Sequence, residues 1–171
     1  HMAVGMEDFQ SVLEEIKDEV QPYFGQGKQA DYIPALANVP GTKFAMAVQT
    51  VDGETFSVGD AEDSFSIQSI SKLFTLMQVL GFEDVDIWSR VGREPSGTAF
   101  NSLVQLEYEK GIPRNPFINA GAIVVTDILA SRSADTSRRI SDYYRMLSGN
   151  PGNRVDEDGA KSEEDHGNRN A

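Results

Sequence analysis

One predicted β-hairpin most constrains what this chain can fold into. Residues 43–51 (KFAMAVQTV) and 54–59 (ETFSVG) have the composition of two strands, and Asp52-Gly53 between them is typical of a two-residue turn. A two-stranded hairpin is only marginally stable by itself in water. The sequence therefore predicts a small sheet of two strands together with a helical part.

The helical part is predicted from the spacing of apolar residues. In residues 6–20 the apolar side chains recur at helical spacing, with acidic residues on the opposite face. Residues 117–129 (FINAGAIVVTDIL) are too apolar all round for a surface helix, so we expect that helix to be buried. Further helices are predicted from Ser69 onward, over 101–110 and over 136–147, and loops over 23–38, 91–98 and 111–116.

The length and charge of the chain exclude several classes of function. Its 171 residues predict one domain with a core of its own. The 15 basic and 27 acidic residues give a formal net charge of −12, which argues against binding to the phosphate backbone of nucleic acids. No run of 18 apolar residues occurs in the sequence, so we expect no membrane span and no membrane partner.

The lack of cysteine and the scarcity of histidine exclude further kinds of site. Without cysteine the chain can have no thiolate nucleophile, no thiolate zinc site and no disulfide. We interpret His1-Met2 as a cloning scar, which leaves His166 alone; it could serve a Ser-His-Asp triad, but a His-rich metal site is out of reach. We therefore expect no metal. The absence of cysteine also fits a reducing compartment, so the expected location is the cytoplasm.

Ser69 and Lys72 are the candidate catalytic pair. In the segment FSIQSISKLF (65–74) they stand three residues apart at the predicted start of a helix, so they share one helix face. An amine at that distance can take the proton of a serine that would otherwise be a poor nucleophile, which is the Ser/Lys chemistry of amide hydrolysis. The alternative is a helix start with an ordinary exposed lysine, because chance alone produces about 0.5 such patterns in a chain of this composition.

The apolar surroundings of Lys72 favour the catalytic interpretation. Residues 70–77 are mostly apolar, and a charged amine in such a run is costly unless it has a partner. To act as a base near pH 7, the pKa of Lys72 must fall by about 3 pH units, a difference of ~4 kcal/mol between the two protonation states. Burial favours the neutral amine, and N–H groups at the helix start would face a developing oxyanion.

Three longer segments carry a resemblance to a known family. FSIQSISKLF (65–74), VGREPSGTAFNS (91–102) and GIPRNPFINAGAIVVTD (111–127) together closely resemble the serine-dependent glutaminases, which share a β-lactamase-like fold with penicillin-recognising enzymes. The resemblance implies an α/β fold of the α+β type, as in β-lactamases and penicillin-binding proteins. It also implies hydrolysis of L-glutamine to L-glutamate and ammonia, no metal or organic cofactor, and a homo-oligomer.

The resemblance also implies roles for individual residues. Ser69 matches the family nucleophile and Lys72 its activating partner. Tyr32 matches a pocket tyrosine, and we expect Gln68 to orient the nucleophile turn at the substrate. The residues that match the remaining substrate contacts are Asn119, Glu163 and Asn170.

These residue types suit a zwitterionic amide substrate. Glu163 would pair with the ammonium group, and an asparagine amide can both donate to a carboxylate and accept from an amide. Each assignment has a structural alternative. Asn119 could cap the helix that follows, Tyr32 could be loop packing, and without the resemblance Glu163 and Asn170 would be interpreted as residues of a disordered tail.

The resemblance covers about the first half of a family member. We therefore expect residues 3–171 to be the N-terminal portion of a single catalytic domain. The other half would carry further pocket tyrosines, a backbone donor for the oxyanion and the strands that complete the sheet. If the chain ends at residue 171, we expect it to show little or no glutaminase activity.

Two other functions stay open at the level of sequence. A penicillin-binding or β-lactamase-like serine hydrolase would use the same Ser/Lys pair, and Ser148-Gly149-Asn150 has the spacing of a second β-lactamase motif. We interpret that tripeptide as a loop, and no Lys-Thr-Gly occurs in the chain, which counts against this class. The second alternative is a catalytically inactive fragment that acts as a binding module.

Overall fold

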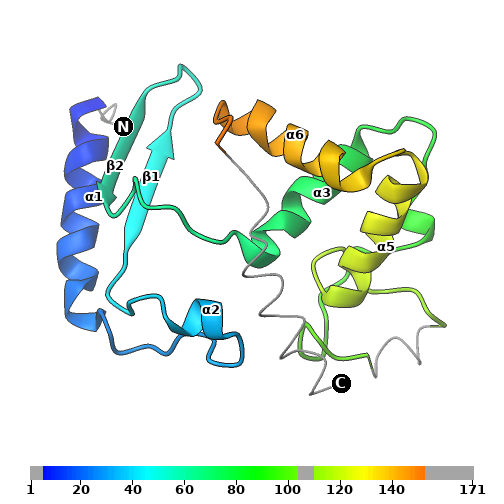
Figure 1. Ribbon diagram of the computed structural model, residues 1–171, viewed down its shortest axis with the longest axis horizontal. Helices are drawn as coiled ribbons and strands as arrows, with labels where there is room; N and C mark the ends of the chain where they lie inside the picture. Colours follow the sequence, from blue (N-terminus) through cyan, green and yellow to red (C-terminus); the bar gives the residue numbers. More distant parts are fainter. Residues whose placement is uncertain (1–5, 104–109, 153–171) are drawn as a thin grey trace. The chain divides into compact units, whose positions relative to one another are not determined.

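The predicted hairpin forms in the first of two units into which the chain divides. The computed structural model describes residues 6–103 and 110–152, and the two units comprise residues 6–66 and 67–152 of these. The elements of the first unit are α1 (Met6–Val20), the short helices η1 (Gln21–Tyr23) and α2 (Pro34–Ala37), and the strands β1 (Ala45–Gln49) and β2 (Thr55–Gly59) (Figure 1). The segment 23–38, predicted to be a loop, therefore contains one helical turn, which begins at a proline.

Apolar side chains alternate with more exposed ones along the hairpin, and they create one apolar face that packs on α1. The strands are antiparallel, with Ala45 opposite Gly59 and Gln49 opposite Thr55. Successive side chains of a strand point to opposite faces, so Met46, Val48, Phe56 and Val58 share one face and are the more buried residues. The ring of Phe9 in α1 lies 5.5 Å from that of Phe56. This contact supplies the packing that an isolated hairpin lacks.

The turn of the hairpin differs from the predicted two-residue type. Gly53 N donates to Thr50 O and Thr50 N donates to Glu54 O, so three residues, Val51-Asp52-Gly53, connect the paired strands. Gly53 has a φ of +90°, which glycine adopts without strain. The prediction was wrong because Asp-Gly also suits a β-turn followed by a glycine bulge, and the strand register selects between the two.

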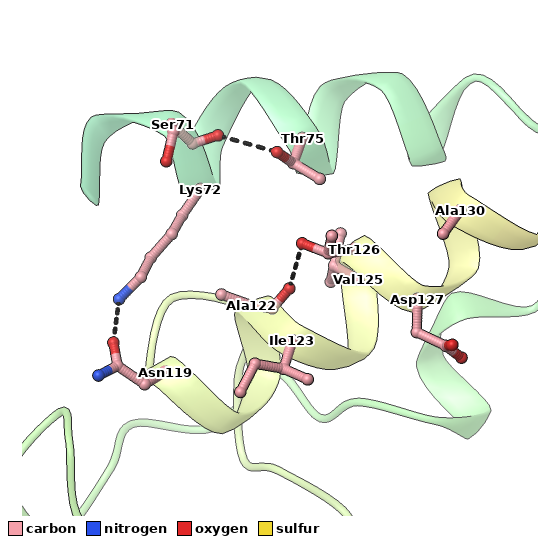
Figure 2. A pocket seen from close by; sticks show the side chains of 10 residues that line it. All are labelled: Ser71, Lys72, Thr75, Asn119, Ala122, Ile123, Val125, Thr126, Asp127 and Ala130. Atoms are coloured by element: carbon pink, nitrogen blue, oxygen red, sulfur yellow. Dashed lines mark hydrogen bonds between the residues drawn. The ribbon is translucent and has the colours of Figure 1, made fainter. Parts of the chain in front are cut away.

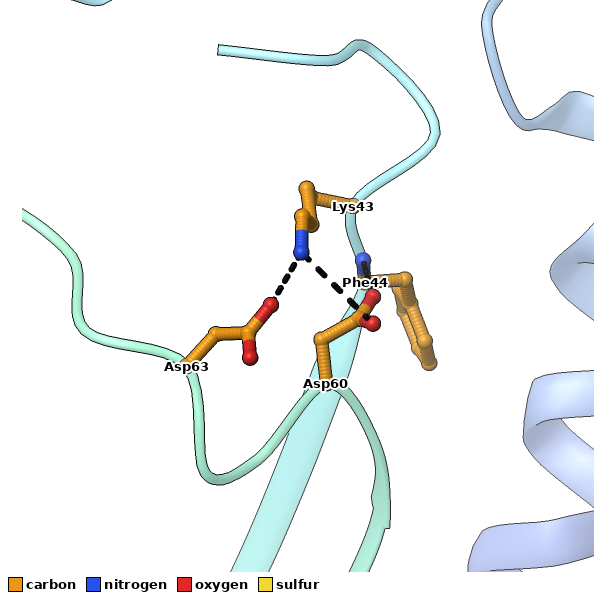
Figure 3. A network of polar contacts seen from close by, with 4 residues as sticks. All are labelled: Lys43, Phe44, Asp60 and Asp63. Atoms are coloured by element: carbon orange, nitrogen blue, oxygen red, sulfur yellow. Dashed lines mark hydrogen bonds and ion pairs between the residues drawn. The ribbon is translucent and has the colours of Figure 1, made fainter.

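A polar cluster ties the open end of the hairpin together. Lys43, just before β1, pairs with the carboxylate of Asp63 and lies 3.9 Å from that of Asp60, which accepts a hydrogen bond from Phe44 N at 3.0 Å (Figure 3). All three charged side chains are nearly half exposed. Such exposed pairs contribute at most about 1 kcal/mol, so we assign this cluster a role in local order.

The second unit is built around a helix pair. Its elements are η2 (Gln68–Ile70), α3 (Ser71–Leu80), η3 (Ile87–Ser89), α5 (Asn119–Ser131) and α6 (Thr136–Ser148) (Figure 1). The core joins α3, α5 and the segment around η3, and its most buried members are Val79, Val91, Val125 and Leu129. The helix predicted over 136–147 is confirmed as α6. Most of the helix predicted over 101–110 lies outside the described residues.

The helix α5 is buried on one side only. Val125, Ile128 and Leu129 are buried as predicted, but Ile123 is 68% exposed and Thr126 is also exposed. The expectation of complete burial is therefore wrong for this structure. In residues 117–129 the sequence gives a high content of apolar residues on every face, and only the packing partners decide which face is covered.

α3 buries an amide that has no partner in the part of the chain that the structure describes. Gln78 is 7% exposed, and neither Oε1 nor Nε2 makes a hydrogen bond. A buried polar group without a partner keeps the full desolvation cost of leaving water. The long, unbranched side chain of methionine fills a similar volume without that cost.

We therefore expect Gln78→Met to raise the free energy of unfolding by about 1 kcal/mol or more. Urea denaturation of the two proteins, with a constant m-value, measures the change. The exposed Gln49→Met is the matched control and should leave the free energy nearly unchanged. A loss of stability in Gln78→Met would show that the amide has a partner in solution.

Candidate active site

Lys72 lies in the first turn of α3 and its amine is directed at the start of α5. Nζ donates to Asn119 Oδ1 at 2.7 Å (Figure 2). It also donates to the carbonyl oxygen of Phe117 at 2.9 Å. The ring of Phe100 lies 5.6 Å from the same nitrogen. Two residues of one segment, 45 and 47 positions away in sequence, therefore accept the hydrogen bonds of this amine.

The charges around Lys72 do not favour its ammonium form. Among the described residues, no carboxylate forms an ion pair with Nζ, and both of its acceptors are neutral oxygens. Partial burial lowers the pKa of Lys72 from its ordinary value, through desolvation. Asp127, the acidic group that also lines this region on α5, pairs instead with Arg90 at 2.8 Å. The site thus moves the amine toward the neutral form that a base needs.

Ser69 and Gln68 lie in the helical turn η2, directly before α3. Ser69 is exposed, and the structure shows no hydrogen bond between its Oγ and Lys72 Nζ. Gln68 has a φ of +43°, a left-handed conformation that is uncommon for residues other than glycine. Strained backbone of this kind is concentrated at functional sites. The role of Gln68 in orienting the nucleophile turn stays a prediction.

The start of α5 is set by a side chain that the sequence did not single out. Asn115 Oδ1 accepts hydrogen bonds from the backbone N–H groups of Phe117 and Ile118, at 3.0 and 3.1 Å. Ile118 is the N-cap and Asn119 the first helical residue, so Asn119 does not cap the helix with its side chain. The capping alternative for Asn119 is therefore wrong, because the N-cap position belongs to Ile118 and the side-chain oxygen of Asn119 accepts from Lys72.

A glycine lets the chain approach α5 at this point. A Cβ atom on Gly121 would overlap the carbonyl oxygen of Asn115 and lie 3.0 Å from Cα of Pro116. The Asn115-Pro116 segment can thus pass over the first turn of α5 only because residue 121 has no side chain. This close approach places the Phe117 carbonyl within reach of Lys72.

The loop segments 92–95 and 113–115 are joined by hydrogen bonds. Gly92 N donates to Pro113 O and Glu94 N donates to Arg114 O, each at 2.8 Å. The side-chain amide of Asn115 donates to Glu94 O at 3.0 Å. These bonds hold residues 113–115 in position ahead of α5. The prolines of both segments restrict the backbone there, because each proline fixes its own φ.

An open hollow of about 580 Å³ lies between α3 and α5 (Figure 2). α3 lines it with Ser71, Lys72 and Thr75, and α5 lines it with a row of residues from Asn119 to Ala130. The volume falls within the range of small-molecule sites. Ser69 is not among the lining residues, and its neighbour Ser71 is.

The other predicted site residues are distributed as follows. Lys72 and Asn119 are brought together, and Ser69 and Gln68 lie one turn before Lys72. Tyr32 belongs to the first unit, directly before α2, and is 60% exposed. Glu163 and Asn170 lie outside the described residues.

Sequence reasoning missed the contribution of the backbone and of Asn115. A carbonyl oxygen such as that of Phe117 has no signal in a sequence. The Asn-Pro pair at 115–116 does carry one, because asparagine before a proline is a frequent turn initiator.

In the described parts of the chain, no group of three or more His, Asp or Glu residues could hold a metal ion. None of the helices described there is both long and apolar enough to cross a membrane.

Comparison with known proteins decides the family. The family model described as "Glutaminase" matches residues 27–171 of this chain. The chain belongs to the glutaminase family.

Individual relatives agree with this membership. The chain is 56% identical to a glutaminase of Aeromonas hydrophila over 161 residues, which cover 94% of this chain and 53% of that protein. A solved structure described as a probable glutaminase superposes with a TM-score of 0.86 at 34% identity, covering 97% of this chain and 54% of the other. The chain thus spans about half the length of the glutaminases it matches, and the predicted β-lactamase-like fold class is confirmed by these neighbours.

A second solved structure is a covalent complex. The Bacillus subtilis glutaminase in it carries 5-oxo-L-norleucine, formed by reaction of the protein with 6-diazo-5-oxo-L-norleucine. It superposes on this chain with a TM-score of 0.72 at 26% identity, covering 94% of this chain and 50% of the other. That glutaminase therefore reacts covalently with 6-diazo-5-oxo-L-norleucine.

The close approach at Gly121 makes a prediction for this glutaminase-family chain. We expect Gly121→Ala to lower the free energy of unfolding by about 1–3 kcal/mol, because the new methyl group must displace the Asn115 carbonyl. The measurement is urea denaturation. The control is Gly27→Ala, where a Cβ meets nothing within 4 Å and the stability should stay equal or rise by up to about 1 kcal/mol. Equal effects of the two substitutions would contradict the proposed close packing.

Proposed function

We propose that this chain carries the nucleophile and the base of a glutaminase that hydrolyses L-glutamine to L-glutamate and ammonia. The observation that carries the proposal is the state of Lys72 in a member of the glutaminase family. Within residues 6–103 and 110–152 its amine has only neutral acceptors, its pKa is lowered, and it follows Ser69 by one helical turn. A lysine in that state can act as a general base.

The reaction proceeds in two halves. Ser69 Oγ attacks the carbon of the side-chain amide while its proton passes to Lys72 Nζ. The tetrahedral intermediate collapses as Lys72 returns the proton to the leaving nitrogen, so ammonia departs and an ester of Ser69 remains. Water then attacks the ester, again with Lys72 as base, and releases L-glutamate. The protons balance, because the base is neutral at the start and at the end of each half.

We propose that a local adjustment brings Ser69 and Lys72 together for this step. They lie in consecutive turns, η2 and α3, and catalytic hydrogen bonds are often long or poorly aligned without substrate. Rotation of the exposed Ser69 side chain toward the hollow, or one intervening water, would connect the two groups. The covalent complex of the Bacillus subtilis glutaminase supports a nucleophilic mechanism for the family.

The substrate contacts remain those that the resemblance implies. We propose that Tyr32, Gln68 and Asn119 contact the glutamine, with Glu163 pairing its ammonium group and Asn170 its polar head. Asn119 lines the hollow, which supports a substrate contact for this residue.

The activity proposed here is that of a whole catalytic domain. We propose that residues 3–171 form the N-terminal portion of that domain, because the matched glutaminases are about twice as long and the described residues contain a sheet of two strands. We also propose a cytoplasmic location, from the absence of cysteine, and self-association into a homo-oligomer, from the resemblance. Fractionation and light scattering test these two points.

A chimera tests the catalytic proposal. In the Aeromonas hydrophila glutaminase, the matched 161-residue segment is replaced by this chain, and ammonia release from L-glutamine is measured. We expect Ser69→Ala in the chimera to reduce kcat/KM by about 10³-fold or more, since loss of a nucleophile removes the covalent path. Ser71→Ala is the matched control, because Ser71 is the serine that lines the hollow two residues later. Retained activity in Ser69→Ala, or loss in Ser71→Ala alone, would refute Ser69 as the nucleophile.

The lowered pKa of Lys72 predicts the pH dependence of the same chimera. The base must be neutral, so kcat/KM should rise as pH increases through the pKa of Lys72. Because desolvation lowers that pKa, the half-maximal rate should lie below 10.5, the ordinary lysine value. The measurement is a pH profile of kcat/KM, with Lys72→Met as the control that should lose the activity. A value of kcat/KM that does not change with pH below 10.5 would argue against Lys72 as the base.

A further inference from the structure

The contacts of Lys72 match the hydrogens of its neutral form. A neutral amine has two N–H bonds and one lone pair, whereas an ammonium has three N–H bonds and no lone pair. Nζ has two acceptors in the described structure, Asn119 Oδ1 at 2.7 Å and Phe117 O at 2.9 Å. The neutral amine can therefore satisfy both of its hydrogens and still keep its lone pair unoccupied.

The orientation of the Asn119 amide is part of this arrangement. Its Oδ1 faces Nζ and accepts, which leaves the lone pair of the amine unused. An amide turned the other way would present an N–H to the nitrogen and occupy that lone pair. The carbonyl of Phe117 can only accept, so the second contact enforces the same direction of donation.

The position of Asn119 is fixed independently of Lys72. Asn119 N donates to Phe100 O at 2.9 Å, and Asn115 holds the two residues before it. Because Asn119 is the first residue of α5, its side chain stands on a helix that is packed against α3 through the core. The acceptor is thus held by the fold and does not follow the movements of the lysine.

The charged and aromatic groups near the Lys72 amine, among the described residues, bear on its protonation. α3 contributes no carboxylate to the hollow, and the Asp127 carboxylate of α5 is engaged by Arg90 at 2.8 Å. The ring of Phe100, 5.6 Å away, favours a cation through its face and can stabilise an ammonium that forms there. The surroundings therefore tolerate a transient positive charge without holding a permanent one.

We propose that Asn119 is a positioning residue for the base: with the Phe117 carbonyl it accepts both hydrogens of the neutral Lys72 amine and leaves its lone pair free for the proton of Ser69. The proton that leaves Ser69 Oγ forms the third N–H bond of Lys72, while the two existing bonds stay in place. This role differs from the substrate contact that the resemblance implies for Asn119. Its catalytic meaning rests on the proposed function, but the contact itself does not.

Titration of Lys72 in the 171-residue chain tests the contact without requiring activity. Lysine labelled with ¹³C at Cε allows each pKa to be followed by NMR, and Lys72→Arg assigns the signal among the six lysines. Asn119→Asp keeps the shape of the side chain but replaces a neutral acceptor by a carboxylate. We expect the pKa of Lys72 to rise by about 1–3 pH units, the usual effect of an opposite charge at this distance.

The matched control adds the same charge elsewhere in the second unit. Asn150→Asp changes an amide to a carboxylate in the exposed turn after α6, and it should leave the pKa of Lys72 unchanged. If the Asn119→Asp protein is folded but the pKa of its Lys72 is unchanged, the proposal is overturned. Asn119→Ala is the second variant: ¹³C relaxation should show Lys72 Cε becoming as mobile as the exposed Lys110, and an unchanged mobility also overturns it.

Kinetics of the chimera separate positioning from substrate binding. If Asn119 positions the base, Asn119→Ala should lower kcat by about 10-fold or more with a small change in KM. A raised KM with an unchanged kcat would assign Asn119 to substrate binding alone and overturn the proposal. A chimera that releases no ammonia, although Lys72 still responds to Asn119→Asp, would overturn the proposed function and leave the contact standing.

Discussion

The packing of α3 on α5 is the interaction on which the second unit and its candidate site depend. Val79 of α3 and Leu129 and Val125 of α5 are almost completely buried and join the two helices into one core. Each such side chain contributes about 1.5–3 kcal/mol through burial. Because the helices are held side by side, the first turn of α3 lies opposite the first turn of α5, and Lys72 meets Asn119.

The site is placed at the end of the helix pair where polar backbone groups are available. Beyond the core, the loops 92–95 and 113–115 hydrogen-bond to each other and carry the chain over Gly121. The result is a carbonyl oxygen and an amide oxygen that both face one amine. Such preorganised neutral acceptors orient a base without raising its pKa as a carboxylate would.

Part of this arrangement could be predicted. The amphipathic helix α1 was predicted with its observed bounds, and the two strands were found to within two residues, because strong periodicity survives in any tertiary context. Lys72 was identified as a partly sheltered amine from the apolar residues around it. The hairpin turn and the complete burial of α5 were predicted wrongly, since strand register and the choice of covered helix face depend on residues distant in sequence.

Local chemistry in the sequence determined which groups are present: a serine and a lysine one turn apart, an asparagine at the start of an apolar helix, and glycines and prolines where the chain turns. The tertiary structure alone decided that the lysine donates to the asparagine and to the Phe117 carbonyl. The physical reason is the range of the forces. Helix spacing and turn preferences act over a few neighbours, whereas these contacts join atoms of residues more than 40 positions apart, which only the packing of α3 on α5 brings within hydrogen-bond distance.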